Sequence, residues 1–185
     1  MSLGRIVPEK GLHYLIPAFK KCKTDKKLII AGGSNSNKDY YESLQEMAKD
    51  DNRIIFTGFV TGQVITELYS NAYIFAIPSN LEGMANALLE AMSYGNCCLI
   101  SDIPENTEVV NDKAVWHKKG SESDIYAKLQ YLLDHPEIVA KFKSEAAPYI
   151  LSRYSWDRVV DQMLEIYGGN VVEYEEILRR YEQKS

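Results

Sequence analysis

The chain of 185 residues has little cysteine and no long apolar run. Its cysteines, Cys22, Cys97 and Cys98, have neither C-x-x-C nor metal-ligand spacing, so no zinc or redox centre built on thiolates is predicted. Cys97 and Cys98 are adjacent in an apolar strand pattern. We expect them on opposite faces of a sheet, as small buried side chains in a reducing cytoplasm. No segment approaches the roughly 20 apolar residues that span a bilayer, and the opening residues lack a secretory signal.

The sequence also lacks the basic excess that a nucleic-acid partner requires. Its net charge is −5, which argues against binding to a phosphate backbone. One local cluster is basic: Lys20, Lys21, Lys23, Lys26 and Lys27. We interpret it as a solvated helix end near a C-terminal dipole, in preference to a membrane-facing patch. A cytoplasmic location is expected, with the inner face of the membrane as the open alternative.

Short apolar runs alternate with helical patterns along the first two thirds of the chain, which is typical of βαβ units. The fold class predicted is α/β: a Rossmann-like, three-layer domain with a parallel sheet of about six strands and extra C-terminal helices. The strands are expected at 3–6, 28–31, 54–56, 73–77, 98–100 and 114–116. Helices are expected at about 11–21, 39–49, 63–71 and 85–93, with a short turn at 105–110.

After the last strand the pattern becomes helical throughout, with helices predicted at 121–133, 136–151 and 156–167. Ser121 is an N-cap candidate, and Pro136 suits a first helical turn. Gly168-Gly169 breaks the pattern, so we divide the chain into a domain at 1–169 and an amphipathic helical tail at 170–185. The apolar stripe of this tail consists of Val171, Tyr174, Ile177, Leu178 and Tyr181. We expect it to be the most mobile helix or a contact between copies.

The most informative feature is a pair of glutamates, Glu82 and Glu90, in the run PSNLEGMANALLEAMSYG. Glu82 follows an apolar strand, and Glu90 lies one to two turns into the next helix. Doubly wound sheets bind ligands at the carboxyl ends of their strands. Two carboxylates and a helix N-terminus would therefore surround one crevice, where a sugar and a diphosphate could both be held. Taken alone, Glu90 would more readily be interpreted as a solvated helix side chain, and the loop after Glu82 as a glycine-containing turn that needs no ligand.

The spacing of these glutamates matches the E-x7-E signature of retaining glycosyltransferases. The stretch with Pro78-Ser79, Glu82-Gly83, Leu89 to Met92, Gly95 and Ser101-Asp102 resembles glycosyltransferase family 4, and the resemblance runs to about Tyr167. It implies one half of a GT-B fold, the C-terminal domain that binds a nucleotide diphosphate sugar as donor. Because Met1-Ser2-Leu3 leads directly into a motif, we expect an excised domain. Its partner would be an N-terminal acceptor domain, without which it is inactive.

The resemblance also implies roles for residues. Glu82 would lie beside the donor sugar, and Glu90 would accept hydrogen bonds from both ribose hydroxyls. Arg5 and Lys10 match the G-R-x4-K-G loop that neutralises the leaving diphosphate, Arg5 as a fork and Lys10 as a point charge. Stabilising charge on the departing oxygen lowers the barrier to transfer. The catalytic set predicted is therefore Glu82, Arg5 and Lys10.

The remaining donor-binding predictions concern mainly backbone. We expect close approach of the chain to the donor at Gly4 and Gly33, and contact with the base at Phe59 and Val60. The loop of Gly83, Met84, Ala85 and Asn86 should point its N–H groups at sugar and phosphate. Family members more often have an aromatic residue and a glycine after Glu-Gly. This departure leaves the sugar open, and base, acceptor and linkage are not predicted.

Two missing motifs narrow the chemistry. The chain has no Asp-x-Asp, so we expect no metal and no cofactor. It has no G-x-G-x-x-G after a strand, so a dinucleotide oxidoreductase is not predicted. His13, His117 and His135 have no ligand spacing and are interpreted as structural. Two alternatives to a transferase stay open: a sugar-nucleotide epimerase of the same fold, and a non-catalytic nucleotide-binding module in which the candidate residues do not converge.

Overall fold

The computed structural model describes residues 1–33, 37–83, 85–154 and 156–167. Two compact units are present, Met1–Ile150 and Leu151–Ser185. Every strand found in the described residues belongs to the first unit, and so do the candidate site residues. The tail predicted at 170–185 lies outside the described residues, so it stays a prediction, as does the division after residue 169. Across the described residues, no helix is both long enough and apolar enough to cross a membrane.

Six short parallel strands form two three-stranded sheets. They are β1 (Ser2–Leu3), β2 (Leu28–Ala31), β3 (Ile54–Gly58), β4 (Ile74–Ile77), β5 (Cys97–Ser101) and β6 (Val115–His117). Within the two sheets the orders are β1-β2-β3 and β4-β5-β6. The backbone of Met1 joins them: it accepts from Ala76 N–H at 2.8 Å, and its amino group donates to the Ile74 carbonyl at 2.7 Å. The resulting succession, 3-2-1-4-5-6, is that of a Rossmann-like fold.

The predicted strand at 3–6 is wrong in its bounds, because β1 ends at Leu3. Gly4 still donates to the Ala31 carbonyl at 3.0 Å, but its φ of 154° departs from the strand conformation. At this point the two chain segments are unusually close. A Cβ atom on Gly32 would lie 1.8 Å from the Gly4 carbonyl oxygen. The strand therefore ends where backbone meets backbone, just before Arg5.

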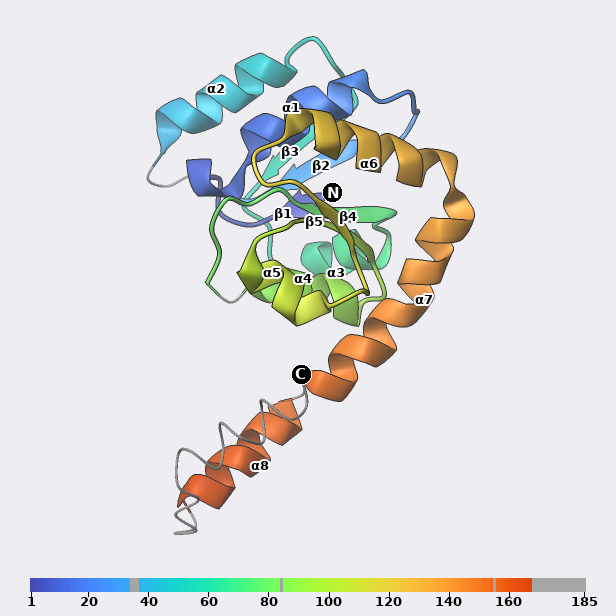
Figure 1. The fold of residues 1–185 in the computed structure, drawn as a ribbon. Coiled ribbons are helices and arrows are strands. Elements are labelled where there is room, and N and C mark those ends of the chain that lie inside the picture. The colour runs from blue at the N-terminus through green and yellow to red at the C-terminus, as the bar shows by residue number, and fades with distance from the viewer. Residues whose placement is uncertain (34–36, 84, 155, 168–185) are drawn as a thin grey trace. The chain divides into compact units, whose positions relative to one another are not determined.

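Helices cover both sides of the strands, giving the three predicted layers (Figure 1). On one side are α1 (Leu12–Lys21), α2 (Lys38–Ala48) and α6 (Glu122–Asp134), and on the other are α3 (Gln63–Ser70), α4 (Asn86–Ser93) and α5 (Pro104–Val110). A short 3-10 helix, η1 (Pro8–Lys10), precedes α1, and α7 (Pro136–Arg153) follows α6. The cap predicted at Ser121 is confirmed, since its Oγ accepts from the Asp124 amide at 3.3 Å.

Alternation along the central strands separates two apolar cores. On β5, Cys97 and Leu99 belong to the core beneath α1, α2 and α6, whereas Cys98 and Ile100 belong to the core beneath α3, α4 and α5. The two cysteines are therefore buried on opposite faces, as predicted. Burial raises the pKa of the Cys97 thiol to about 12, so this thiol stays protonated and unreactive.

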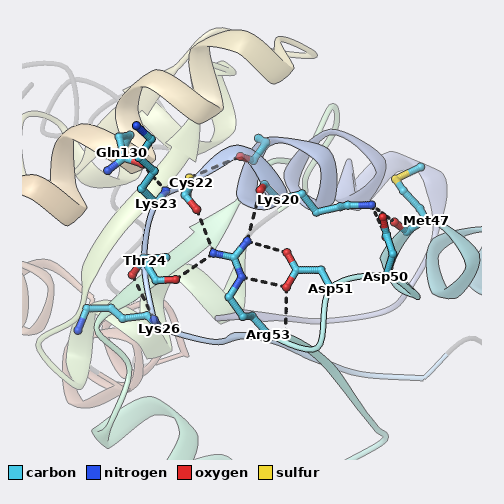
Figure 2. A network of polar contacts seen from close by, with 11 residues as sticks. Lys20, Cys22, Lys23, Thr24, Lys26, Met47, Asp50, Asp51, Arg53 and Gln130 are labelled. Atoms are coloured by element: carbon cyan, nitrogen blue, oxygen red, sulfur yellow. Dashed lines mark hydrogen bonds and ion pairs between the residues drawn. The ribbon is translucent and has the colours of Figure 1, made fainter.

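A network centred on Arg53 fastens α1 to the start of β3 (Figure 2). Its guanidinium donates to both carboxylate oxygens of Asp51, at 2.9 and 2.6 Å. It also donates to the carbonyls of Lys20, Cys22 and Thr24, at 3.3, 2.9 and 2.9 Å. These carbonyls lie at the end of α1, where helical partners run out. The network therefore satisfies the C-terminus of α1 with a charged donor.

Two lysines of the basic cluster have acidic partners. The Lys20 ammonium binds the Asp50 carboxylate, and the Lys21 ammonium lies 2.6 Å from the Glu122 carboxylate. Lys26 lies over the Tyr73 ring, 3.9 Å from its centroid. These contacts support the interpretation of the cluster as a helix end held by neighbouring elements.

Unit two contains the helix α8 (Trp156–Tyr167), which matches the predicted bounds. Several apolar side chains on it are exposed, among them Val160, Met163 and Leu164. Their spacing of three and four residues places them on one side of the helix.

Candidate functional site

A cleft of about 440 Å³ lies at the carboxyl ends of β1, β2 and β4. It is lined by seven of the predicted site residues, Gly4, Arg5, Lys10, Glu82, Gly83, Ala85 and Asn86. Residues outside the predicted site set complete the wall: Ser2, Leu3, Leu12, Ile30, Ala31, Ile77, Pro78, Ser79 and Ala87. Parallel strands present their carboxyl ends at one edge, and this edge is where ligands bind in such sheets.

The cleft depends on a close backbone approach at Gly11, which links η1 to α1. Gly11 has a φ of 67°, and a Cβ atom there would lie 2.0 Å from the Pro78 carbonyl oxygen. The neighbouring Asn80 amide donates to the Glu9 carbonyl at 2.7 Å. Only glycine fits this contact without strain. The loop that carries Lys10 is thereby held against the loop that carries Glu82.

Lys10 and Glu82 meet directly in the cleft although they lie 72 positions apart. The Lys10 ammonium donates to both carboxylate oxygens, at 2.7 and 2.6 Å. Glu82 also accepts from the Ser79 hydroxyl at 2.6 Å. The Glu82 side chain is only 6% exposed, compared with 27% for Lys10. A nearly buried carboxylate is therefore held by one cation and one hydroxyl.

A buried polar relay supports the loop that carries Glu82, and sequence reasoning missed it. The Ser101 hydroxyl donates to the Ser79 carbonyl at 2.6 Å, and the Asn106 amide donates to the Ser101 oxygen at 3.0 Å. All three side chains are at most 1% exposed. The relay runs from α5 through the end of β5 to the end of β4. It fixes the segment from which Glu82 projects.

The cleft also receives Arg5 and the start of α4. Arg5 is exposed, and it makes no ion pair with any residue that the structure describes. Ala85, the N-cap residue of α4, has no side chain that could accept from the first amides of the helix. The Leu88 amide donates to the Ala85 carbonyl at 2.8 Å, but no acceptor is described for the amides of Asn86 and Ala87, which are therefore available to an anion together with the positive end of the helix dipole. A diphosphate placed here would meet two cations and a helix N-terminus.

Glu90 does not line the cleft itself. It lies on α4 three and four residues after Ala87 and Asn86, which do line it, so it continues the same side of the helix. The Glu90 carboxylate is exposed and accepts from the Tyr69 hydroxyl at 2.8 Å. Arg5 and Lys10 thus share the cleft, whereas Glu90 lies outside its lining, so the convergence of all three residues, which would exclude a non-catalytic module, stays a prediction.

Three other predicted donor-binding residues lie outside the lining of the cleft. The carbonyl of Gly33 accepts from the Ile6 amide at 3.0 Å. Phe59 and Val60 follow β3, and the Phe59 side chain is 80% exposed. Met84 falls outside the described residues. The roles predicted for these four residues remain predictions.

The arrangement can stabilise an anionic leaving group by direct charge. Among the described residues, no group of three or more His, Cys, Asp and Glu side chains could hold a metal ion. His13 binds the Tyr40 hydroxyl at 2.8 Å, and His117 is 2% exposed, so both have structural surroundings. The charged groups that face the cleft are Arg5, Lys10 and Glu82.

The family model for glycosyl transferases group 1 matches residues 1–148. An uncharacterised glycosyltransferase of Methanocaldococcus jannaschii is 30% identical over 175 residues, covering 90% of this chain and 44% of the relative. The O-antigen chain mannosyltransferase of Salmonella typhimurium is 28% identical over 152 residues, covering 80% of this chain and 42% of the relative. The chain thus spans less than half the length of these relatives.

Solved structures have the same fold. A crystal structure of the Anabaena protein HepE with UDP-glucose superposes with a TM-score of 0.82 at 21% identity, over 90% of this chain and 48% of that one. The C-terminal domain of a glycosyl transferase group 1 family protein from Francisella tularensis superposes with a TM-score of 0.75 at 23% identity, over 84% of this chain and 85% of that one.

Proposed function

Because the chain belongs to the glycosyl transferases group 1 family, we propose that it is the donor-binding half of a retaining, family 4 enzyme with a GT-B fold. The observation that carries this proposal is the convergence of Arg5, the Lys10–Glu82 pair and the start of α4 on one cleft. The similarity in fold to a C-terminal domain that stands alone supports it. The acceptor would be bound by an N-terminal domain, which accounts for the greater length of the relatives.

In the proposed reaction the bond between the anomeric carbon and the diphosphate oxygen breaks, and a bond to an acceptor hydroxyl oxygen forms on the same face of the sugar. The acceptor proton passes to the departing phosphate. Arg5 and Lys10 stabilise the charge that develops on the diphosphate, and the first amides of α4 add their dipole. Glu82 lies beside the sugar, and Glu90 binds the ribose hydroxyls. The donor needs no metal in this scheme, because the two cations replace it.

Calorimetry with nucleoside diphosphates in the presence of a chelator tests the proposal. UDP is the first probe, because UDP and UDP-glucose are present in structures of similar fold; GDP, ADP and dTDP follow. We expect one of them to bind without divalent metal. Binding that requires magnesium or manganese would contradict the metal-free scheme. Absence of binding by the whole panel would contradict donor binding altogether.

Glu90→Gln is the matched variant for the ribose contact. It should weaken the binding of the nucleotide by roughly 1–3 kcal/mol, the value of hydrogen bonds to a charged acceptor. Far-ultraviolet circular dichroism should stay unchanged, since the Glu90 carboxylate is exposed. An unaltered affinity would mean that Glu90 serves only the protein surface.

The chain alone should bind the donor without transferring sugar, and the full-length enzyme should transfer it. Release of a free sugar epimer by the full-length enzyme without acceptor would instead indicate an epimerase. The cytoplasmic location, with peripheral association at the inner membrane face as its alternative, stays part of the proposal. Fractionation of cells that express the full-length enzyme tests it.

A further inference from the structure

A buried tyrosine holds the exposed carboxylate of Glu90 from below. Tyr69 lies in the last turn of α3, and Glu90 lies in the second turn of α4. The Tyr69 hydroxyl donates to Glu90 Oε2 at 2.8 Å. Tyr69 is 1% exposed, whereas Glu90 is exposed. A hydroxyl inside the protein therefore reaches a carboxylate at the surface. Among the described residues, Glu90 is its only hydrogen-bond partner.

The direction of the Tyr69 ring is fixed by its neighbours. The ring stacks on Tyr94 with centroids 5.3 Å apart and an interplanar angle of 17°, and it packs against Phe75 at 5.5 Å. Its backbone carbonyl accepts from the buried Asn96 amide at 3.0 Å. Close packing of this kind restricts the movement of the ring. Burial, and then the bond to Glu90, raise the pKa of Tyr69, so its hydroxyl remains a donor at physiological pH.

We propose that Tyr69 is a positioning residue that fixes the Glu90 carboxylate for the two ribose hydroxyls of the donor nucleotide. This inference rests on the proposed function. An ionised carboxylate offers about four lone-pair sites. Tyr69 uses one of them on Oε2, and Oε1 has no donor among the described residues. Both ribose hydroxyls can therefore still be accepted while the carboxylate is held in place.

The gain from this contact is preorganisation. A free glutamate side chain at the surface loses rotamer freedom when it binds a ligand, and this loss weakens binding. In this protein the Glu90 side chain already loses this rotamer freedom when the protein folds, because the buried phenol of Tyr69 favours one orientation of the carboxylate. Removing the Tyr69 hydroxyl should therefore lower the affinity for a ribonucleotide by roughly 3- to 10-fold. It should not affect a ligand that lacks the ribose hydroxyls.

Titration calorimetry of four proteins with UDP and with 2′,3′-dideoxy-UDP tests the proposal; the proteins are the wild type, Tyr69→Phe, Glu90→Gln and the double variant. If the wild type prefers another nucleoside diphosphate, that diphosphate and its dideoxy analogue replace them. We expect Tyr69→Phe to lower the affinity for the ribonucleotide and to leave the affinity for the dideoxynucleotide unchanged. The double variant should bind like Glu90→Gln, because Tyr69 acts through Glu90. Tyr94→Phe is the control, since it removes a hydroxyl from the stacked ring and leaves the Tyr69–Glu90 bond intact.

The outcomes separate this inference from the proposed function. If the wild type binds no nucleoside diphosphate, the proposed function fails and this inference fails with it. If the wild type binds and Tyr69→Phe binds equally well, only the positioning role is overturned. Equal losses for ribo- and dideoxynucleotide would indicate a packing effect and would also overturn it. Thermal melts show whether Tyr69→Phe is folded. If it is not, replacing Tyr69 by 4-fluorophenylalanine, which keeps the volume of the ring and removes only the hydrogen-bond donor, provides the same test.

Discussion

The Arg53–Asp51 and Lys10–Glu82 ion pairs have similar geometry and different surroundings. Both are bidentate, and the two cations are similarly exposed, at 24% for Arg53 and 27% for Lys10. Every nitrogen of the Arg53 guanidinium donates to an acceptor of the protein, and three of these acceptors are backbone carbonyls (Figure 2). Both hydrogen bonds described for the Lys10 ammonium go to Glu82, on the wall of a cleft.

This difference separates an ion pair that holds the fold from one that can exchange its partner. Replacing the contacts of Arg53 would require new acceptors for five hydrogen bonds at a helix end. Lys10 can turn from one carboxylate to a diphosphate oxygen while remaining charge-paired. The cost of the exchange falls on Glu82, which would then need a new donor. In the proposed complex, the sugar hydroxyls supply that donor.

The largest effect is expected from breaking the Arg53–Asp51 pair. Arg53→Ala should lower the free energy of unfolding by about 3 kcal/mol, because several acceptors of α1 and the Asp51 carboxylate lose a charged donor. Denaturation by urea measures this loss. Lys38→Ala is the matched control: it removes a cation from the exposed Lys38–Glu42 pair and should cost less than about 0.5 kcal/mol. Equal losses for the two variants would contradict the role given to Arg53.

The next effect concerns the cleft and should appear in binding. Lys10→Met should weaken the binding of UDP by about 2 kcal/mol, because a charge-assisted contact is lost and Glu82 is left facing the diphosphate. The free energy of unfolding should fall less than in Arg53→Ala. The double variant Lys10→Met/Glu82→Gln should recover part of the affinity, since the uncompensated carboxylate is gone. An affinity unchanged by Lys10→Met, measured by calorimetry, would place the diphosphate elsewhere.

The sequence could predict the fold and several residues of the cleft, but not the contact between Lys10 and Glu82. Alternation of apolar runs and helical patterns was enough for six parallel strands between layers of helices. The motifs around Arg5, Lys10 and Glu82 predicted residues that the fold brings into one cleft. No local pattern indicated that Lys10 and Glu82 bind one another, because this contact depends on the approach of Gly11 to Pro78. Contacts between loops are set by the packing of the elements they join.

The supporting residues were harder to predict for a related reason. Ser101 and Asn106 lie at the end of a strand and in a short helix, where polar residues usually face water. Only the structure shows them buried and bonded beneath the Glu82 loop. Tyr69 fits the apolar side of α3, so its hydroxyl gave no signal. The first strand was predicted too long because Ile6 is apolar and buried, although the strand has ended by then.

A smaller effect distinguishes the sugar from the diphosphate as the partner of Glu82. Glu82→Gln should change the affinity for UDP by less than about 3-fold, because UDP lacks the donor sugar that Glu82 would contact and Lys10 stays available. The affinity for the nucleotide sugar should fall further, and transfer by the full-length enzyme should fall most. Calorimetry with both ligands and an assay of transfer measure the three changes. Similar losses for UDP and its sugar would assign Glu82 to the diphosphate.

The smallest effect is expected from His117, a buried group that belongs to neither ion pair. Burial lowers the pKa of His117 below its ordinary value of 6.5, and it outweighs the opposing effect of the Lys118 carbonyl oxygen, which lies 3.1 Å from Nδ1 and favours the charged ring. The unfolded chain therefore binds a proton on this ring at a higher pH than the folded protein does. It follows that the full stabilisation is present above pH 6.5 and declines as the pH falls from 6.5 toward the pKa of the folded state.

His117→Gln should reduce this dependence on pH, because glutamine does not titrate. Urea denaturation of the two proteins between pH 5 and pH 8 measures it, and their free energies of unfolding should converge as the pH falls. Part of the slope should remain in the variant, since burial also lowers the pKa of His13. Nucleotide affinity measured at pH 8 should be the same for both proteins. A pH dependence unchanged by the substitution would mean that the pKa of His117 is the same in the folded and the unfolded protein, and would contradict the effect assigned to burial.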